Sequence, residues 1–250
     1  MSYLSDSKIY RDGDKLVKVY LSDPYEYVEK AYQRQKFAHD AGLPVPAVFG
    51  IKKISETETA VEMEYIEGQP LVSMYEGNGE EMRVKAMRIM AKLQCQMNAI
   101  DASGLPDLTD MYVHEITTTP HLTAHQKDVL LAYMKSLDKG KANLCHGDIH
   151  YYNIMYHGDK YWIIDWESAG KGDPAADACM QYFYSMRQAA QDNNQSHMHY
   201  LQIFCEASGI SKEDVLAWLP VIAGVQVNFP PDGEEREFIS KFIDEWFKER

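Results

Sequence analysis

The chain has 250 residues, of which 45% are hydrophobic and 12% aromatic, and its formal net charge is −13 at pH 7. This composition is sufficient for a hydrophobic core, so we expect a folded chain and not a disordered one. The acidic balance argues against nucleic acid and anionic membrane as partners, because both require a basic surface. It would suit a cationic substrate, although many ordinary proteins are acidic.

The apolar runs and the cysteines indicate the compartment. The longest apolar runs, YWIIDW and WLPVIAGVQV, are shorter than the roughly 20 residues that a membrane-spanning helix needs. The N-terminal stretch MSYLSDSKIYRDGDK lacks the apolar region of a signal peptide. The cysteines form no C-x-x-C pair, so we expect reduced thiols at Cys95, Cys145, Cys179 and Cys205. A cytoplasmic location follows as the expectation.

The pattern of the sequence changes near residue 68. Before it lie the β-rich runs KIY, KLVKVY, AVFGIKKI and TAVEMEYI, with one helix among them. After Gly68 and Pro70 the chain is mainly helical. Helical patterns are expected at about 80–100, 123–138, 174–190, 196–208 and 211–224, and from Glu234 to the end. We therefore predict an α+β, two-lobed fold, with a small β-rich lobe over 1–67 and a larger helical lobe over 68–250.

The helix of the first lobe has recognisable ends. Asp23 can cap its start, Pro24 fits its first turn, and Glu26 would complete a capping box. Gly42 would end it. If Glu26 serves as a cap, Glu29 is the next acidic residue along this helix, and the sequence supplies no structural task for it.

A predicted hairpin follows the polar stretch LCHGDIHYYNI. The apolar runs IMY and YWII flank HGDK, and a turn at Gly158-Asp159 would pair Ile154 with Ile163. This register puts Asn153 beside Ile164, and therefore next to Asp165. Two oxygen-bearing side chains are thus expected at the open end of one hairpin.

These residues suit phosphoryl transfer. Amide and carboxylate oxygens are ligands of Mg²⁺, and Asp148 on the preceding loop could orient an attacking hydroxyl. A second interpretation is a metal-dependent phosphatase, because Asp148 and His150 form a D-x-H. The G-N-H-[DE] element that completes such a site is absent from the sequence, which favours the first interpretation.

Three segments, HGDIHYYN, YWIIDW and GDPAAD, resemble in order and spacing the signature of the aminoglycoside phosphotransferase and choline kinase family. Its members share a two-lobed, protein-kinase-like fold. The resemblance implies that Asp148 is the catalytic aspartate and that Asn153 and Asp165 bind Mg²⁺. It also implies that Asp173 and Asp177 brace the catalytic loop, and that His146 and His150 have structural roles.

The first lobe extends the resemblance to the nucleotide. KLVKVY resembles the strand that carries the ATP-contacting lysine, here Lys18. The resemblance implies that Glu29 pairs with Lys18, and that backbone groups from Glu64 to Ile66 meet the adenine. Mg²⁺ and ATP are the implied cofactors, and GTP is possible.

Two features depart from the family pattern. Tyr151 and Tyr152 occupy a variable pair that is usually proline and glycine, so larger side chains would line or restrict the mouth of the site. No glycine-rich loop precedes SKIYRDG, and Ser5 and Ser7 are the hydroxyls that could contact phosphate in its place.

The acceptor is open at this stage among aminoglycosides, choline or ethanolamine, and sugar or amino-alcohol metabolites. The resemblance and the acidic charge favour a small cationic amino sugar, and an acidic cluster could face it, at Asp232, Glu234, Glu235 and Glu237. A non-catalytic nucleotide-binding protein on the same fold is the alternative, because a fold does not imply activity. The oligomeric state is also open.

Overall fold

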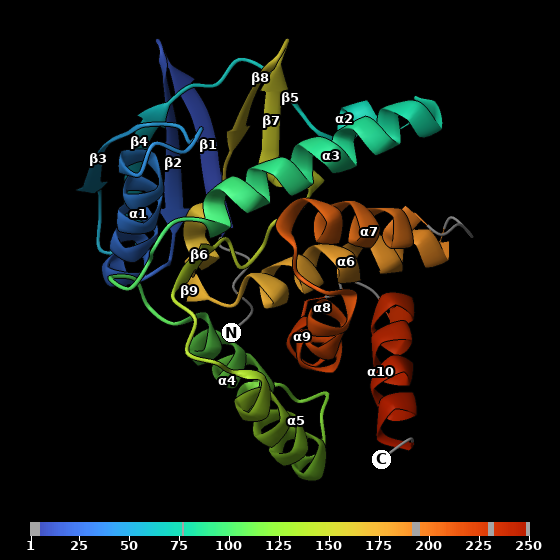
Figure 1. Cartoon of the computed structure of the whole chain (residues 1–250). Coiled ribbons are helices and arrows are strands. Elements are labelled where there is room, and N and C mark those ends of the chain that lie inside the picture. The colour runs from blue at the N-terminus through green and yellow to red at the C-terminus, as the bar shows by residue number, and fades with distance from the viewer. Residues whose placement is uncertain (1–5, 77, 192–195, 230–232, 249–250) are drawn as a thin grey trace. The chain divides into compact units, whose positions relative to one another are not determined.

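The computed structural model describes residues 6–76, 78–191, 196–229 and 233–248, and the chain divides into two compact units (Figure 1). The first unit holds the described residues up to Ile100, together with His150–Ala169. The second holds Asp101–Ile149 and the described residues from Gly170 onward. The lobe boundary that the sequence places after residue 67 stays a prediction.

The first unit contains a four-stranded antiparallel sheet in the order β1-β2-β4-β3. Its strands are β1 (Asp6–Asp12), β2 (Lys15–Leu21), β3 (Val48–Lys53) and β4 (Glu58–Glu64), which confirms the predicted β-rich runs. One face buries Val17 and Val19 with Ala60, and Tyr20 and Val61 pack with Val28 of the helix α1. The two faces of β2 are thus both covered in part, as the near-continuous apolar sequence of this strand suggests.

The helix α1 (Tyr25–Asp40) begins one residue later than the predicted cap requires. Pro24 is its N-cap, and no side chain caps it, so the expected capping role of Asp23 is wrong. Asp23 lies one position too early to accept an N–H of the first turn. The predicted end is confirmed, since Gly42 follows the helix with a φ of 83°, a conformation that glycine adopts without strain.

The first unit also contains a second sheet and several helical elements (Figure 1). The second sheet has three strands, in the order β5 (Gln69–Pro70), β7 (Ile154–His157) and β8 (Lys160–Ile163). The helical elements are α2 (Val72–Tyr75), α3 (Gly79–Asn98), η1 (Tyr151–Asn153) and η2 (Trp166–Ser168). The β7-β8 hairpin has the predicted register, with Ile154 opposite Ile163 and Tyr156 opposite Tyr161.

The second unit is helical around one buried helix. Its elements are α4 (Leu108–Thr118), α5 (Ala124–Leu137), β6 (Asn143–Cys145), β9 (Gly170–Gly172), α6 (Pro174–Gln191), α7 (Ser196–Ser208), α8 (Lys212–Ala217), α9 (Leu219–Gln226) and α10 (Gly233–Lys248). The helix α9 carries no charged residue and contacts α4, α5, α6 and α10.

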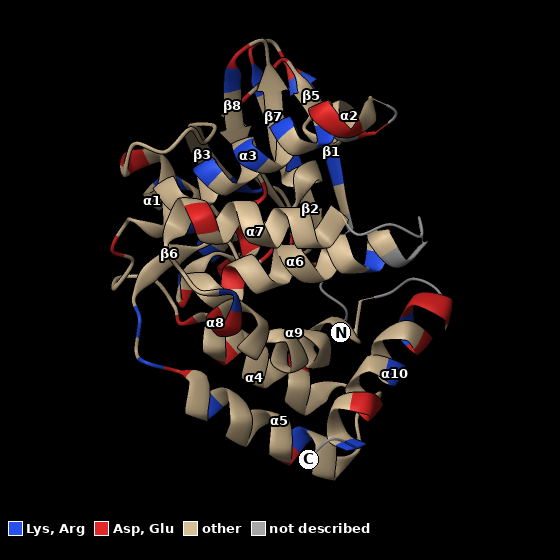
Figure 2. Ribbon diagram, turned by 45° about the vertical axis from the view of Figure 1, so that its right-hand side comes forward, with Lys and Arg blue, Asp and Glu red and all other residues tan. Residues whose placement is uncertain are grey.

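Most helices of this unit match the predicted patterns. The helix α4 was not among the expected patterns. The pattern expected over 211–224 divides at Trp218, which follows α8 and precedes α9, whose second residue is Pro220. Ser211 caps α8 as the sequence indicates. Glu234 and Glu235 begin α10, where Figure 2 shows acidic residues.

Two further expectations concern the cysteines and the apolar runs. All four cysteines are free thiols. Among the helices of the described ranges, none combines the length and the apolar character that crossing a membrane requires.

Gly68, just before β5, lies close to the backbone of β7, and this close approach can be tested by substitution. A Cβ at this position would lie 2.6 Å from the carbonyl oxygen of Tyr156, which faces Gln69 across the sheet. We expect Gly68→Ala to lower the free energy of unfolding by about 1–3 kcal/mol, because backbone and not a flexible side chain must move. Gly50→Ala is the matched control, since no heavy atom lies within 4 Å of its added Cβ. Denaturant unfolding checks the pair, and equal effects would contradict the assignment.

Candidate nucleotide site and catalytic loop

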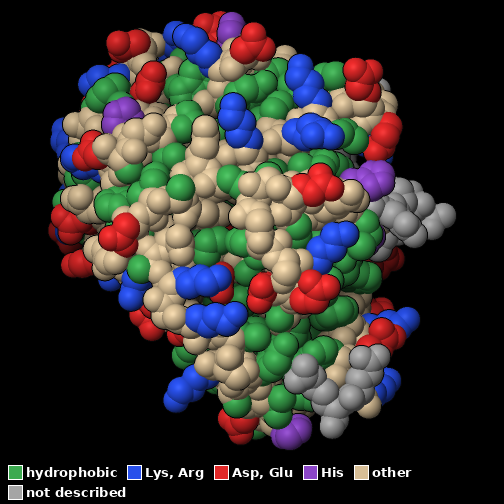
Figure 3. All heavy atoms as spheres, viewed as in Figure 1, with side chains coloured by type: hydrophobic (Ala, Val, Ile, Leu, Met, Phe, Trp, Pro, Cys, Tyr) green, Lys and Arg blue, Asp and Glu red, His purple; other side chains and the backbone are tan. Residues whose placement is uncertain are grey.

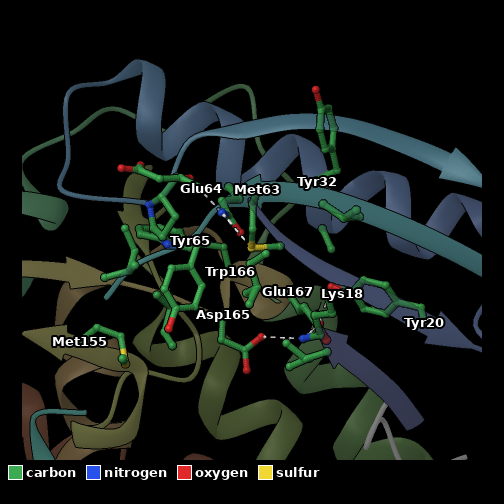
Figure 4. A pocket seen from close by; sticks show the side chains of 18 of the residues that line it. Lys18, Tyr20, Tyr32, Met63, Glu64, Tyr65, Met155, Asp165, Trp166 and Glu167 are labelled. Atoms are coloured by element: carbon green, nitrogen blue, oxygen red, sulfur yellow. Dashed lines mark hydrogen bonds and ion pairs between the residues drawn. The ribbon is translucent and has the colours of Figure 1, made fainter. Parts of the chain in front are cut away.

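A cavity of about 320 Å³ lies within the first unit. Apolar side chains line much of it, and the charged side chains of Lys18, Asp165 and Glu167 lie together at one part of its wall (Figure 4). The apolar lining includes Leu16, Val61, Met63, Met155 and Ile164. An apolar chamber with a few convergent charged groups is typical of a ligand site.

Lys18 is the cation of this cavity. Its ammonium lies 2.5 Å from Oε1 of Glu167 and 3.4 Å from Oδ1 of Asp165. Burial by itself lowers the pKa of Lys18, but the two carboxylates outweigh burial and raise that pKa above its ordinary value. Lys18 therefore carries its positive charge at neutral pH. Leu16 and Tyr20, which share the strand face of Lys18, line the same cavity.

Glu167 is fixed by donors from two elements. Its carboxylate accepts hydrogen bonds from the hydroxyls of Tyr20 at 2.7 Å and Tyr27 at 3.1 Å, and the guanidinium of Arg34 donates to its backbone carbonyl. Burial, followed by the charge of Glu167, raises the pKa values of Tyr20 and Tyr27, so both phenols keep their protons. Glu167 was not among the site residues expected from the sequence, although its place two residues after Asp165 was a signal.

Asp165 adopts a backbone conformation that few non-glycine residues adopt. Its φ of 65° and ψ of 64° lie in the left-handed region, where a side chain is strained. The side chain is 43% exposed and lies on the cavity wall. Strain of this kind is concentrated at functional sites, where surrounding structure maintains it.

Asn153 lies at the end of the hairpin, as its register predicts. Its backbone carbonyl accepts a hydrogen bond of 2.9 Å from the N–H of Ile164, the residue before Asp165. The side chain of Asn153 is 6% exposed. The structure therefore brings Asn153 and the segment of Asp165 together in one unit.

The pairing expected for Glu29 differs from that in the structure. Glu29 is an exposed residue of α1, and the ion pairs of Lys18 are those with Glu167 and Asp165. The residues that α1 contributes to the cavity wall are Ala31, Tyr32 and Gln35. The expectation was wrong because Glu29 is exposed to solvent, and Glu167 supplies the carboxylate that pairs with Lys18.

The segment from Glu64, the last residue of β4, to Ile66 lines the cavity. Glu64 is fixed by its N–H, which donates to the carbonyl of Ala47 at 2.8 Å, and by its carboxylate, which accepts from the N–H of Ala47 at 3.2 Å. The N–H of Tyr65 donates to the carbonyl of Asp14 at 3.1 Å. Among the described residues, the N–H of Ile66 has no hydrogen-bond partner.

Asp148 lies in the second unit, on the loop that follows β6. The hydroxyl of Tyr184, on α6, donates a hydrogen bond of 2.6 Å to its carboxylate. Burial, and then the charge of Asp148, raises the pKa of Tyr184 well above its ordinary value. Tyr184 was not among the site residues expected from the sequence, although it lies two helical turns after Asp177 and so on the same face of α6.

The GDPAAD segment braces this loop from within the same unit. The N–H of Gly147 donates to Oδ1 of Asp177 at 2.9 Å, and Gly147 has a φ of 76°. Asp173 accepts from the N–H of Ala175 at 2.9 Å and pairs with Lys141 at 2.8 Å. The residue before Asp148 is thus fixed by a buried carboxylate, as the resemblance implies.

The remaining residues of interest are structural or surface groups. His146 is fully buried, and burial lowers the pKa of His150. Tyr151 is buried, whereas Tyr152 is 59% exposed and its hydroxyl donates to Glu76 at 3.4 Å. Ser7 lies in β1, and Ser5 lies outside the described residues.

Comparison with known proteins identifies the family. The model of the phosphotransferase enzyme family matches residues 4–207. The chain belongs to this family. The predicted phosphotransferase activity, with a hydroxyl as the acceptor group, is thereby confirmed in place of the metal-dependent phosphatase alternative. Curated protein sequences gave no significant match.

Solved structures agree with the family. The chain is 16% identical to aminoglycoside-3′-phosphotransferase of type VIII, with 90% of each chain covered and a TM-score of 0.65. It is 18% identical to APH(3″)-Id of Streptomyces rimosus in complex with ADP and streptomycin, covering 88% of this chain and 92% of that one, with a TM-score of 0.65. It is 16% identical to a thermostable mutant of APH(4)-Ia in complex with ADP and hygromycin B, covering 96% of this chain and 92% of that one, with a TM-score of 0.64. These likenesses establish the kinase-like fold and confirm the predicted fold class.

Tyr184 provides a test of the catalytic loop of this phosphotransferase. Tyr184→Phe removes the hydroxyl that orients the carboxylate of Asp148, so we expect kcat to fall by about tenfold with little change in the nucleotide KM. Tyr182→Phe, on the same helix, is the control, because the hydroxyl of Tyr182 donates to the sulfur of Met198 instead. Steady-state kinetics measure both variants. Equal losses in the two would show that the effect comes from α6 as a whole.

Proposed function

We propose that this phosphotransferase is a Mg²⁺-dependent small-molecule kinase that transfers the γ-phosphoryl of ATP, or of GTP, to a hydroxyl of a small cationic acceptor such as an aminoglycoside. The observation that carries the proposal is the cavity of the first unit, where a half-buried lysine and a strained aspartate converge at the wall of an apolar chamber.

The apolar part of the cavity suits a nucleotide base. Val61, Met63 and Met155 offer flat contact surface for an aromatic ring system. The backbone segment from Glu64 to Ile66 lies beside them, and the N–H of Ile66 is a donor for a ring nitrogen. Backbone groups of this kind can bond either adenine or guanine, so these contacts are compatible with both ATP and GTP. The assay below determines which nucleotide is preferred.

The charged part of the cavity suits phosphate and its metal. Lys18 is protonated and is the residue that would pair with phosphate oxygens. The amide oxygen of Asn153 and the carboxylate of Asp165 are hard donors from adjacent segments, which fits Mg²⁺ held partly by protein and partly by phosphate. When bound, the ion would neutralise charge on the transferring phosphoryl group.

Asp148 is the proposed catalytic residue. A carboxylate that is fixed by Tyr184 can accept a hydrogen bond from the acceptor hydroxyl and align its oxygen for in-line attack. The proton of that hydroxyl would pass to Asp148 as the new P–O bond forms and the bond to the leaving nucleoside diphosphate breaks. Bracing of Gly147 by Asp177 keeps the loop in position.

Several observations favour a cationic acceptor. The structures of APH(3″)-Id and APH(4)-Ia contain the aminoglycosides streptomycin and hygromycin B together with ADP. The net charge of −13 would attract a polycation. The charge is not gathered in one patch on the face in Figure 3, where acidic and basic side chains are interspersed. The predicted acidic cluster contributes less than expected, because Glu235 is paired with Arg187; Asp232 lies outside the described residues.

The acceptor is tested directly by nucleotide consumption. A coupled assay with ATP and with GTP is run over aminoglycosides, amino alcohols such as choline and ethanolamine, and sugars. We expect turnover to depend on an aminoglycoside, because such a polycation complements the acidic chain. Turnover with choline, ethanolamine or a sugar instead would reassign the substrate class. Nucleotide binding without turnover across the panel would support the non-catalytic alternative.

Two aspartate variants separate chemistry from binding. Asp148→Asn should reduce transfer by about a thousandfold or more while Mg²⁺-nucleotide affinity is kept, because the proton acceptor is lost and the first unit is unchanged. Asp165→Ala should weaken Mg²⁺-nucleotide affinity itself, because a metal ligand is lost. Kinetics and calorimetry with Mg²⁺ and AMP-PNP measure the two effects. Full activity of Asp148→Asn would refute the mechanism.

A further inference from the structure

The source of the counter-charge for Lys18 differs from that expected. We propose that Glu167 is a positioning residue that holds the ammonium of Lys18 toward the nucleotide phosphates, in place of an acidic residue from α1. The inference rests on the proposed function, since it assigns Lys18 to the nucleotide, and it adds a residue and a connection that the family match does not supply.

The helix α1 has no acid in the position to serve Lys18. Its contributions to the cavity wall are Ala31, Tyr32 and Gln35, none of which is charged. The acidic residues of this helix near its start, Glu26 and Glu29, are both exposed. A lysine that is 15% exposed beside the apolar wall needs a fixed anionic partner, because an isolated buried charge is costly.

Glu167 meets this need with a geometry that is itself fixed. Its carboxylate is 15% exposed and receives Lys18 at 2.5 Å, Tyr20 at 2.7 Å and Tyr27 at 3.1 Å. Lys18 and Tyr20 come from β2, and Tyr27 comes from α1. A carboxylate with three donors from two elements has little rotational freedom, so it determines where the ammonium lies.

The same contacts connect the lysine to the proposed metal ligand. Glu167 and Asp165 are two residues apart, and Figure 4 shows both close to Lys18. Asp165 lies 3.4 Å from the ammonium, at the long end of the range, whereas Glu167 lies at 2.5 Å. If Asp165 is assigned to the metal, Glu167 is the carboxylate that is left for Lys18. The geometry of η2 therefore sets the spacing between the lysine and the metal ligand.

A double-mutant cycle in the full-length chain tests this role. Glu167→Gln keeps an oxygen that can accept from Tyr20 and Tyr27 but removes the charge that Lys18 faces. We expect it to weaken the affinity for AMP-PNP with Mg²⁺ by about tenfold, and Lys18→Met to weaken it by at least as much. In the double variant, Glu167→Gln should add almost nothing to the loss caused by Lys18→Met. Calorimetric titration measures the four proteins.

A matched control separates this role from lysine–carboxylate pairs in general. Lys15, on the same strand, pairs with Glu62 at 2.8 Å on the exposed surface. Glu62→Gln breaks that pair, and we expect the nucleotide affinity to stay within about twofold of the wild type, because an exposed pair contributes little.

Each outcome bears on one claim. Unchanged affinity in Glu167→Gln, or losses that add in the double variant, would overturn the inference. A wild-type protein that binds no nucleotide would overturn the proposed function instead. If Glu167→Gln does not fold, Tyr27→Phe removes one donor to the same carboxylate. Its loss of affinity should be about threefold, and should disappear in the Lys18→Met background.

Discussion

The contact between Lys18 and Glu167 is the constraint on which the proposed nucleotide site depends. It joins β2 to the segment after the β7-β8 hairpin, with 2.5 Å between the ammonium and the carboxylate. Because Tyr20 and Tyr27 donate to the same carboxylate, the first sheet, α1 and η2 share one polar centre. A charge that is buried in this way is compensated only if every member of the centre is in position.

The proposed chemistry then follows from two local devices, one in each unit. In the first, the hairpin register joins Asn153 to the segment of Asp165 through the N–H of Ile164. In the second, Asp177 holds the N–H of Gly147, and Tyr184 holds the carboxylate of Asp148. Each device restricts a group that the proposed reaction uses.

The sequence predicts the parts of this site that local rules decide. The Gly158-Asp159 turn sets the hairpin register, so the pairing expected for it was correct. The pairing expected for Glu29 was wrong because Glu29 is exposed on α1 and Lys18 pairs with Glu167 instead. Glu167 and Tyr184 meet their partners through tertiary contacts at separations of 149 and 36 residues, and local spacing indicates their faces but not these partners.

Binding of a non-hydrolysable nucleotide to the wild-type protein tests the central claim most directly. Calorimetric titration with AMP-PNP is carried out in the presence of Mg²⁺ and again with the ion removed by a chelator. The account predicts a single site per chain whose affinity falls by at least about tenfold without Mg²⁺, because Asp165 and the phosphates would share the ion. Absence of binding both of AMP-PNP and of the matching guanine analogue, or an affinity that does not respond to Mg²⁺, would contradict it.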